Sequence, residues 1–196
     1  FRPSYLKIRE FADTLAYKPV MSAFTATATD VVRRDIIKIL KLEKPAEVIT
    51  GFDRQNLTFN VLTPKDRYSA LLKILKAKGE KSGIVYCSTR KTVEELCSKL
   101  CSDGYPATRY HAGISDNERT ENQELFLYDT KRIMIATNAF GMGIDKSNVS
   151  YVVHYNMPKN IESYYQEAGR AGRDGSPAEC TLFYSGQDYM TAKFLI

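Results

Sequence analysis

Two kinds of segment alternate along the chain: short, continuous apolar runs and longer stretches with apolar residues three or four positions apart. Short runs rich in β-branched and aromatic residues predict buried strands, and the helical spacing predicts amphipathic helices. Strands are predicted at 19–24, 47–50, 58–62, 83–87, 107–111, 132–136, 149–155 and 178–184. Helices are predicted at 1–17, 29–40, 66–77, from 88–92 to about 103, and at 115–129, 163–172 and 187–196.

Capping residues and glycines mark where several of these helices begin and end. Thr29 or Asp30 can cap the second helix, Gly79 ends the third, and Ser115 with Glu118 forms a capping box. Strands that alternate with helices predict an α/β fold with a mainly parallel sheet covered on both faces. A polar, turn-prone segment after Lys44 and Pro45 predicts a domain boundary there, which divides the chain into 1–47 and 48–196.

Composition narrows the class of protein but does not choose a function. Of the 196 residues, 43% are hydrophobic and 26% are charged, and no apolar run approaches the roughly 20 residues of a membrane span, so no membrane partner is expected. The start without methionine is typical of an excised fragment. A net charge of +5 fits an anionic partner, although such a surplus is also common in proteins that bind no nucleic acid.

The cysteines and histidines predict no metal site. None of the four cysteines forms a CxxC pair, and the two histidines, His111 and His154, stand apart from them. Cys97 and Cys101 lie four apart on an apolar helical stripe, which predicts buried, reduced thiols in an intracellular protein. His154 lies in a predicted strand and is expected to be a packed core residue.

Candidate phosphate-binding residues follow the predicted strands. The carboxyl ends of parallel strands meet at one edge of a sheet, so their loops should collect there. Hydroxyl groups and a cation at a helix start suit phosphate, and closely spaced glycines let backbone amides approach it. The loop residues with these properties are Ser88, Thr89, Arg90, His111, Gly113, Thr137, Asn138, Gly141, Gly143 and Asp145. A dinucleotide-binding loop at GMGIDK is disfavoured, because only the first two glycines of GxGxxG are present.

The segment QEAGRAGRDG concentrates the strongest candidate chemistry. If 163–172 is a helix, Gln166, Arg170 and Arg173 share one face, and two arginines on one face suit a polyphosphate. A solvated basic turn is the simpler alternative. The chain has no GxxxxGK[ST] loop and no acidic DE pair, so it carries no phosphate cradle of the known P-loop type. The arginines are therefore predicted to form one half of a polyphosphate-binding site that is shared with a partner lobe.

Five strings then resemble the successive motifs of RecQ-type DNA helicases, which are superfamily 2 motors. They are AFTATAT, GIVYCSTRKTVEELCSKL, YHAGIS, MIATNAFGMGIDKSNVSYVVHYNMP and SYYQEAGRAGRDG, in family order and at family spacing. The resemblance implies a RecA-like three-layer α/β/α fold with a mainly parallel central sheet. Residues 1–47 would finish the first RecA-like lobe and 48–196 would form most of the second. The lysine loop and DEAH box that bind most of ATP and Mg²⁺ would precede Phe1, and a zinc module would follow Ile196.

The resemblance also implies roles for individual residues. Thr25 and Thr27 would couple hydrolysis to unwinding, and Phe1 and Arg2 would end the loop that senses single-stranded DNA. Asp145, beside Gly143, would contact the nucleotide ribose. Gln166, Arg170 and Arg173 would face the γ-phosphate, with Arg173 preferred as the arginine finger. Contacts to the single-strand backbone would come from Ser88, Thr89, Arg90, His111, Gly113, Thr137 and Asn138. Gln55 departs from the family, which commonly has proline there.

The expected function is therefore the second motor lobe of an ATP-dependent 3′–5′ DNA helicase of DNA repair and recombination, inactive alone. Its expected partners are single-stranded or duplex DNA and the first lobe of the same chain. Such a protein would lie in the cytoplasm and nucleoid of a bacterium or the nucleus of a eukaryote. Two alternatives stay open: a non-catalytic module that binds nucleic acid or a partner protein, and an RNA helicase of the same superfamily.

Overall fold

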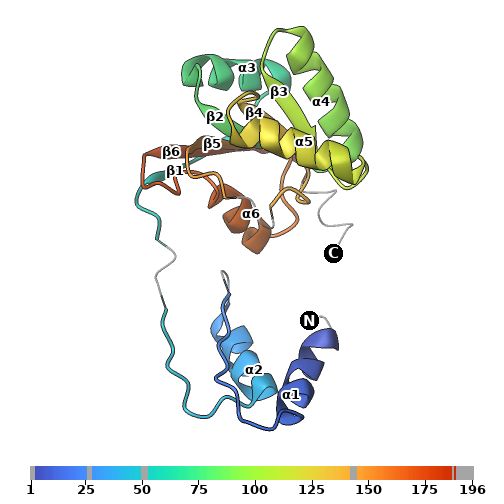
Figure 1. Cartoon of the computed structure of the whole chain (residues 1–196). Helices are drawn as coiled ribbons and strands as arrows, with labels where there is room; N and C mark the ends of the chain where they lie inside the picture. The colour runs from blue at the N-terminus through green and yellow to red at the C-terminus, as the bar shows by residue number, and fades with distance from the viewer. Residues whose placement is uncertain (1–2, 26–27, 50–52, 142–144, 187, 189–196) are drawn as a thin grey trace. The chain divides into compact units, whose positions relative to one another are not determined.

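The computed structural model describes residues 3–25, 28–49, 53–141, 145–186 and 188 (Figure 1). The chain divides into two compact units, residues 1–53 and 54–196. Each unit is described by itself. The assignment of the two parts to two motor lobes stays a prediction.

The first unit contains two helices at the predicted places. A short 3₁₀ turn, η1 (Pro3–Tyr5), leads into α1 (Leu6–Asp13). Helix α2 (Asp30–Leu40) begins after Thr29, whose side chain accepts a hydrogen bond from the Val32 amide. The predicted cap and helix are thus confirmed.

Two strands predicted near these helices are wrong. Residues 18–25 form no strand, and Val20 and Phe24 are 97% and 94% exposed. Residues 47–49 are also exposed and form no strand. A strand satisfies its backbone groups through neighbouring strands. The described part of the first unit offers none, so the apolar run of 19–24 has no sheet to join.

The second unit is built on a six-stranded sheet in the order β1-β6-β5-β2-β4-β3. Its strands are β1 (Leu57–Leu62), β2 (Ser82–Tyr86), β3 (Ala107–Tyr110), β4 (Ile133–Ala136), β5 (Val149–His154) and β6 (Ala178–Phe183). Its helices are α3 (Arg67–Lys78), α4 (Arg90–Ser102), α5 (Asp116–Leu127) and α6 (Ile161–Ala168). All five strand pairings are parallel, which confirms the prediction of a mainly parallel sheet.

Helices cover both faces of this sheet, because alternate residues of each strand point to opposite sides. In β2, Val85 packs with α3 and α4, whereas Ile84 and Tyr86 pack with α5 and α6. Figure 1 shows α3 and α6 on opposite sides of the sheet. Gly83 has a packing reason to be glycine, since a Cβ there would overlap the ring of Tyr151 on β5.

Side chains cap the helices of the second unit largely as predicted. Asp66 caps α3, Thr89 caps α4, and the Ser115 hydroxyl accepts from the Glu118 amide at 3.2 Å. The Glu118 side chain does not complete a capping box, because it bonds Arg109 instead. The predicted helix 187–196 lies outside the described residues except for Asp188.

Candidate functional site

The two arginines of the segment QEAGRAGRDG do not share a helical face. Helix α6 ends at Ala168 with Gly169 as its C-cap, so Arg170 and Arg173 lie in the turn that follows. The expectation of a helix through Gly172 is wrong. After Ala168 the amides of Arg170 and Ala171 donate three residues back, which is a turn pattern, and Gly172, with φ of +57°, cannot continue a right-handed helix. The Gly172 amide donates to the Val149 carbonyl at 2.8 Å instead.

This turn is tied to the start of β1 by Arg54 and Asn56. The Arg54 guanidinium donates to the carbonyls of Ala171 at 3.1 Å and Gly172 at 2.7 Å. Asn56 Nδ2 donates to the carbonyls of Gly172 at 2.8 Å and Ser176 at 2.9 Å. A Cβ on Gly172 would lie 2.5 Å from Asn56 Nδ2, so this approach requires glycine. Arg54 and Asn56 therefore hold the turn that carries the arginines.

Arg173 and Arg170 make different contacts within the site. Arg173 forms an ion pair with Asp145 at 3.1 Å, and both side chains are exposed. Arg170 is half-buried and lies against Gly141, where a Cβ would come 3.1 Å from the guanidinium carbon. Burial raises the pKa of the Tyr86 hydroxyl, and the positive charge of Arg170 opposes that rise. The Nε of Arg170 is buried, and no atom of the described residues accepts a hydrogen bond from it. The turn after α6 and the loop after β4 are thus in contact through Arg170 beside Gly141 and through the ion pair of Arg173 with Asp145.

Gln166 is exposed on the last turn of α6, beside a buried polar pair. The neighbouring Glu167 is largely buried and lies 2.9 Å from His154 Nε2. His154 is fully buried and stacks on Tyr86, with ring centroids 5.5 Å apart. The prediction that His154 is a packed core residue is confirmed, and this pair fixes the end of α6 to the sheet.

A second group of predicted residues lies at the ends of β2 and β5. Ser88, Thr89 and Arg90 are exposed, and the Thr89 hydroxyl accepts from the Thr92 amide at 3.1 Å. The Ser88 amide donates to Asn156 Oδ1 at 3.2 Å, which joins this loop to the one after β5. The start of α4 therefore presents hydroxyls and a cation to solvent.

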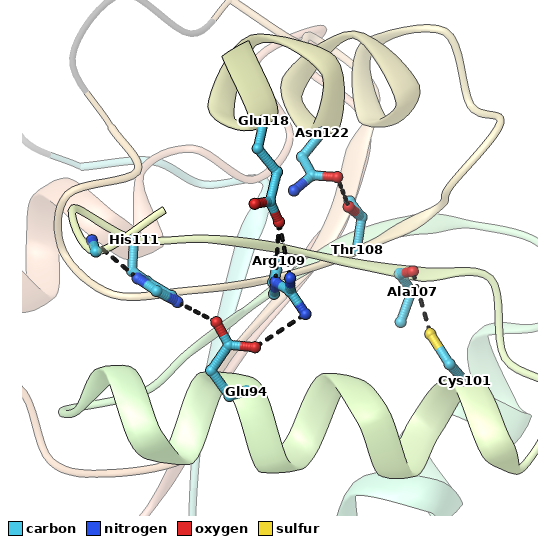
Figure 2. Close-up of polar contacts among 9 residues, drawn as sticks. Glu94, Cys101, Ala107, Thr108, Arg109, His111, Glu118 and Asn122 are labelled. Carbon is cyan, nitrogen blue, oxygen red and sulfur yellow. Dashed lines mark hydrogen bonds and ion pairs between the residues drawn. The ribbon is translucent and has the colours of Figure 1, made fainter. Parts of the chain in front are cut away.

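His111 follows β3 and is buried, with only 4% of its surface exposed. Its Nε2 lies 2.7 Å from Glu94 Oε1, and its Nδ1 accepts from the Gly113 amide at 3.0 Å (Figure 2). A Cβ on Gly113 would lie 3.1 Å from Arg90 Cδ, so this loop is adjacent to the start of α4. The buried His111 side chain therefore holds the 111–113 loop through the Gly113 amide and is not exposed to a ligand.

After β4, the two predicted residues differ in exposure. Thr137 is buried, and its hydroxyl accepts from the Ala139 amide at 3.4 Å. Asn138 is exposed. Asn138 can therefore reach a ligand directly, whereas the Thr137 hydroxyl serves the turn.

An ion pair between buried Lys146 and exposed Asp129 anchors the far end of the loop after β4. Lys146 has a side chain only 3% exposed and contacts Asp129 Oδ1 at 2.9 Å. Asn148 also donates to Asp129, at 3.2 Å. Burial alone would raise the pKa of Asp129, but hydrogen bonds from Ser82, Lys146 and Asn148 lower it below its ordinary value. This ion pair holds Lys146 in place, and Asp145 is the residue directly before it.

The remaining predictions concern the first unit, positions outside the described residues, and the thiols. Thr25 is exposed in the first unit, while Phe1, Arg2, Thr27 and Gly143 lie outside the described residues. All four cysteines are free, and Cys97 is buried as predicted, whereas Cys101 is exposed. Burial raises the pKa of the Cys97 thiol to about 12.

Two surveys of the described residues give negative results. Among residues 3–25, 28–49, 53–141, 145–186 and 188, no three His, Cys, Asp or Glu side chains gather as a metal site would require. In the same part of the chain, no helix combines the length and apolar character needed to cross a membrane.

Several residues that shape the site are not among those predicted from the sequence. Arg54 and Asn56 lie in the polar, turn-prone segment before β1, where a charged residue and an amide directly before a strand were a usable signal. Gln55 begins the turn between them, which the Leu57 amide closes onto the Arg54 carbonyl at 2.9 Å. Glu94 and Asn156 gave no signal, because only the tertiary structure brings them to His111 and Ser88.

Comparison with known proteins places this geometry in a family context. Residues 66–175 match the helicase conserved C-terminal domain family. The chain is 48% identical over 196 residues to the ATP-dependent DNA helicase RecQ of Bacillus subtilis, which covers 100% of this chain and 33% of that protein.

Two further relatives come from a eukaryote and a virus. Identity is 42% to ATP-dependent DNA helicase hus2/rqh1 of Schizosaccharomyces pombe, over 100% of this chain and 15% of that protein. Identity is 40% to a putative ATP-dependent RNA helicase of Acanthamoeba polyphaga mimivirus, over 100% of this chain and 36% of that protein. The chain thus spans about a third or less of the length of these curated relatives.

A solved structure shares the fold. A variant of S. cerevisiae Dbp5 bound to Gle1 and IP6 matches with a TM-score of 0.75 at 22% identity, over 98% of this chain and 51% of that chain. With the parallel sheet covered on both faces, this likeness shows a RecA-like α/β fold.

Proposed function

The chain belongs to the helicase conserved C-terminal domain family and, within it, to the RecQ helicases of superfamily 2, and from this membership we propose that it forms the second motor lobe of an ATP-dependent DNA helicase. In this proposal the lobe moves 3′ to 5′ on single-stranded DNA and completes the ATPase site of a first RecA-like lobe.

One observation carries the proposal of a shared ATPase site. Arg170 and Arg173 belong to one turn, which Arg54 and Asn56 hold beside the start of β1. Each guanidinium carries several N–H donors in a planar arrangement that suits the oxygens of a phosphate. Phosphoryl transfer is catalysed mainly by positioning and by stabilising charge on the transferred group, which is what such arginines supply.

The chain's own residues fit the phosphate of ATP but not its metal. Arginine donors face phosphate oxygens well, and Asp145 can orient Arg173 through their ion pair until a nucleotide competes for it. The described residues contain no acidic cluster for Mg²⁺, so the first lobe would hold that ion. When bound, ATP would supply the hydrolysis that powers movement.

DNA backbone contacts are the second part of the proposal. Ser88, Thr89, Arg90 and Asn138 are exposed after the carboxyl ends of β2 and β4, with Gly113 beside Arg90. Hydroxyls, amides and a cation of this kind bind phosphate and sugar without reading base sequence. We propose DNA and not RNA because most of the relatives described above carry the name DNA helicase.

ATP turnover by the complete helicase that contains this chain tests the proposal. Arg173→Ala should lower DNA-stimulated turnover by roughly 10³-fold while nucleotide affinity changes little, because an arginine finger acts on the transition state. Arg119→Ala, which removes a half-buried arginine paired with Asp116 on α5, is the matched control and should leave turnover unchanged. Unchanged turnover in Arg173→Ala would favour a non-catalytic binding module, and equal unwinding of DNA and RNA duplexes would remove the assignment to DNA.

A further inference from the structure

Four charged or polar side chains form a continuous network over β3, between α4 and α5 (Figure 2). His111 Nε2 lies 2.7 Å from Glu94 Oε1, and the other carboxylate oxygen of Glu94 lies 2.9 Å from Arg109. Arg109 also donates to Glu118 Oε1 at 2.8 Å through one nitrogen and at 3.2 Å through its Nε. Glu94 is therefore held from both sides, by a buried imidazole and by a guanidinium.

The hydrogen bonds of His111 define which ring nitrogen carries the proton. The Gly113 amide can only donate, so the Nδ1 that it contacts at 3.0 Å must be an acceptor. The proton of the neutral ring is then on Nε2, where it is donated to the Glu94 carboxylate. A carboxylate at this position favours that tautomer, because it accepts and cannot donate.

This tautomer sets the shape of the loop beside Arg90. His111 is buried, whereas Ala112 and Gly113 are exposed. Gly113 packs so close to Arg90 that a Cβ would lie 3.1 Å from Arg90 Cδ. The imidazole thus holds the loop through its hydrogen bond to the Gly113 amide, and Gly113 in turn packs against the Arg90 side chain.

We propose that Glu94 is a positioning residue for nucleic-acid binding, acting through His111 on the 111–113 loop and on Arg90. The ligand is a phosphodiester backbone, and this inference rests on the proposed function of the lobe. Glu94 itself touches no phosphate. Arg109 and Glu118 hold the Glu94 carboxylate in the orientation that the imidazole requires.

A purely electrostatic effect of Glu94 and a positioning role predict opposite changes in nucleic-acid affinity when its charge is removed. A carboxylate near a polyanion is repelled by it, so removing a negative charge from this surface should by itself strengthen nucleic-acid binding. A positioning role predicts the opposite. Glu95 provides the matched control, since it lies one residue along α4, is exposed, and pairs with Lys91 alone among the described residues, at 3.8 Å.

The informative substitution is Glu94→Gln, which keeps the shape of the side chain. The Arg109 guanidinium can only donate, so it will retain the amide oxygen, and the amide NH₂ group then faces His111 Nε2. Two donors cannot share that contact, so the ring proton moves to Nδ1. Nδ1 can then no longer accept from the Gly113 amide, so the loop loses the hydrogen bond that holds it to His111.

Affinity for single-stranded DNA, measured by fluorescence anisotropy on the complete helicase that contains this chain, is the first readout. Glu94→Gln should weaken binding by roughly fivefold, the scale of one net hydrogen bond lost. Glu95→Gln should leave binding unchanged or slightly tighter. Equal effects of the two substitutions would overturn the proposal.

The ring nitrogens of His111, observed by ¹⁵N NMR of the 196-residue chain, are the second readout. The proton should be on Nε2 in the wild type and on Nδ1 in Glu94→Gln, together with a shifted Gly113 amide resonance. Weaker binding without this change of tautomer would overturn the positioning role. Arg90→Ala separates the two hypotheses: if it leaves DNA affinity unchanged, the proposed interface fails, and if it alone weakens binding, only the role of Glu94 fails.

Discussion

Arg54 offers the sharpest test of how the arginine-bearing turn is held, because its contacts can be converted into a stability. Its guanidinium donates to the Gly172 carbonyl at 2.7 Å and to the Ala171 carbonyl at 3.1 Å, while a 3.5 Å contact to the Gly169 carbonyl is too long to count. Both acceptors belong to buried residues. Arg54→Ala removes these two charge-assisted hydrogen bonds together.

The magnitude follows from those two bonds. A hydrogen bond to a charged group contributes about 1.5–3 kcal/mol, and Asn56 still bonds the Gly172 carbonyl at 2.8 Å, so the lower end applies. Half-burial of Arg54 reduces the sum further, which leaves about 2–3 kcal/mol. For a domain of this size, where 1 kcal/mol corresponds to about 3 °C, Tm should fall by roughly 8 °C.

Thermal unfolding of the 196-residue chain, followed by circular dichroism, is the assay. Arg119→Ala is the control, because Arg119 pairs with Asp116 on an exposed helix face and such pairs contribute little. Arg54→Lys should fall between wild type and Arg54→Ala, since a single ammonium lacks the forked geometry. The reasoning is refuted if Arg54→Ala shifts Tm no more than Arg119→Ala does.

Three further predictions concern packing, acid stability and thiol reactivity. Gly83→Ala should destabilise the fold by about 3 kcal/mol in chemical denaturation, because its Cβ would overlap the buried Tyr151 ring, whereas Gly186→Ala, with open space around it, should change little. Because the pKa of Asp129 is lowered from 3.8 in the folded state, its stabilising contribution is present above that pH and is lost as the pH falls. The Tm difference between wild type and Asp129→Asn should therefore shrink from pH 6 to pH 3; a constant difference would contradict this. Mass spectrometry after brief alkylation at pH 8 should find one modified thiol, at the exposed Cys101, and rapid modification of the three buried cysteines would show that the core packing is wrong.

Local patterns predicted the elements of the second unit because each carries its own signal. Six apolar runs became the six strands, and Thr89 and Ser115 cap the helices that follow two of them. The same rules failed for 19–24, where the apolar run was real but the described first unit provides no strand to pair with it. A strand is a property of a sheet, so sequence alone overestimates it where the neighbours are lacking.

The sequence by itself determined that this chain alternates strands with helices, that its phosphate-type residues follow the strands, and that its arginines lack a cradle within the chain. These features are local or depend only on the order of elements. The tertiary structure alone decided which residues meet: Arg173 with Asp145, Arg54 with the turn around Gly172, and His111 with Glu94. The partners in these pairs are 17 (His111 and Glu94), 28 (Arg173 and Asp145) and 118 (Arg54 and Gly172) positions apart in sequence. Only packing of the sheet with its helices can bring such residues within hydrogen-bond reach, because no local periodicity encodes that proximity.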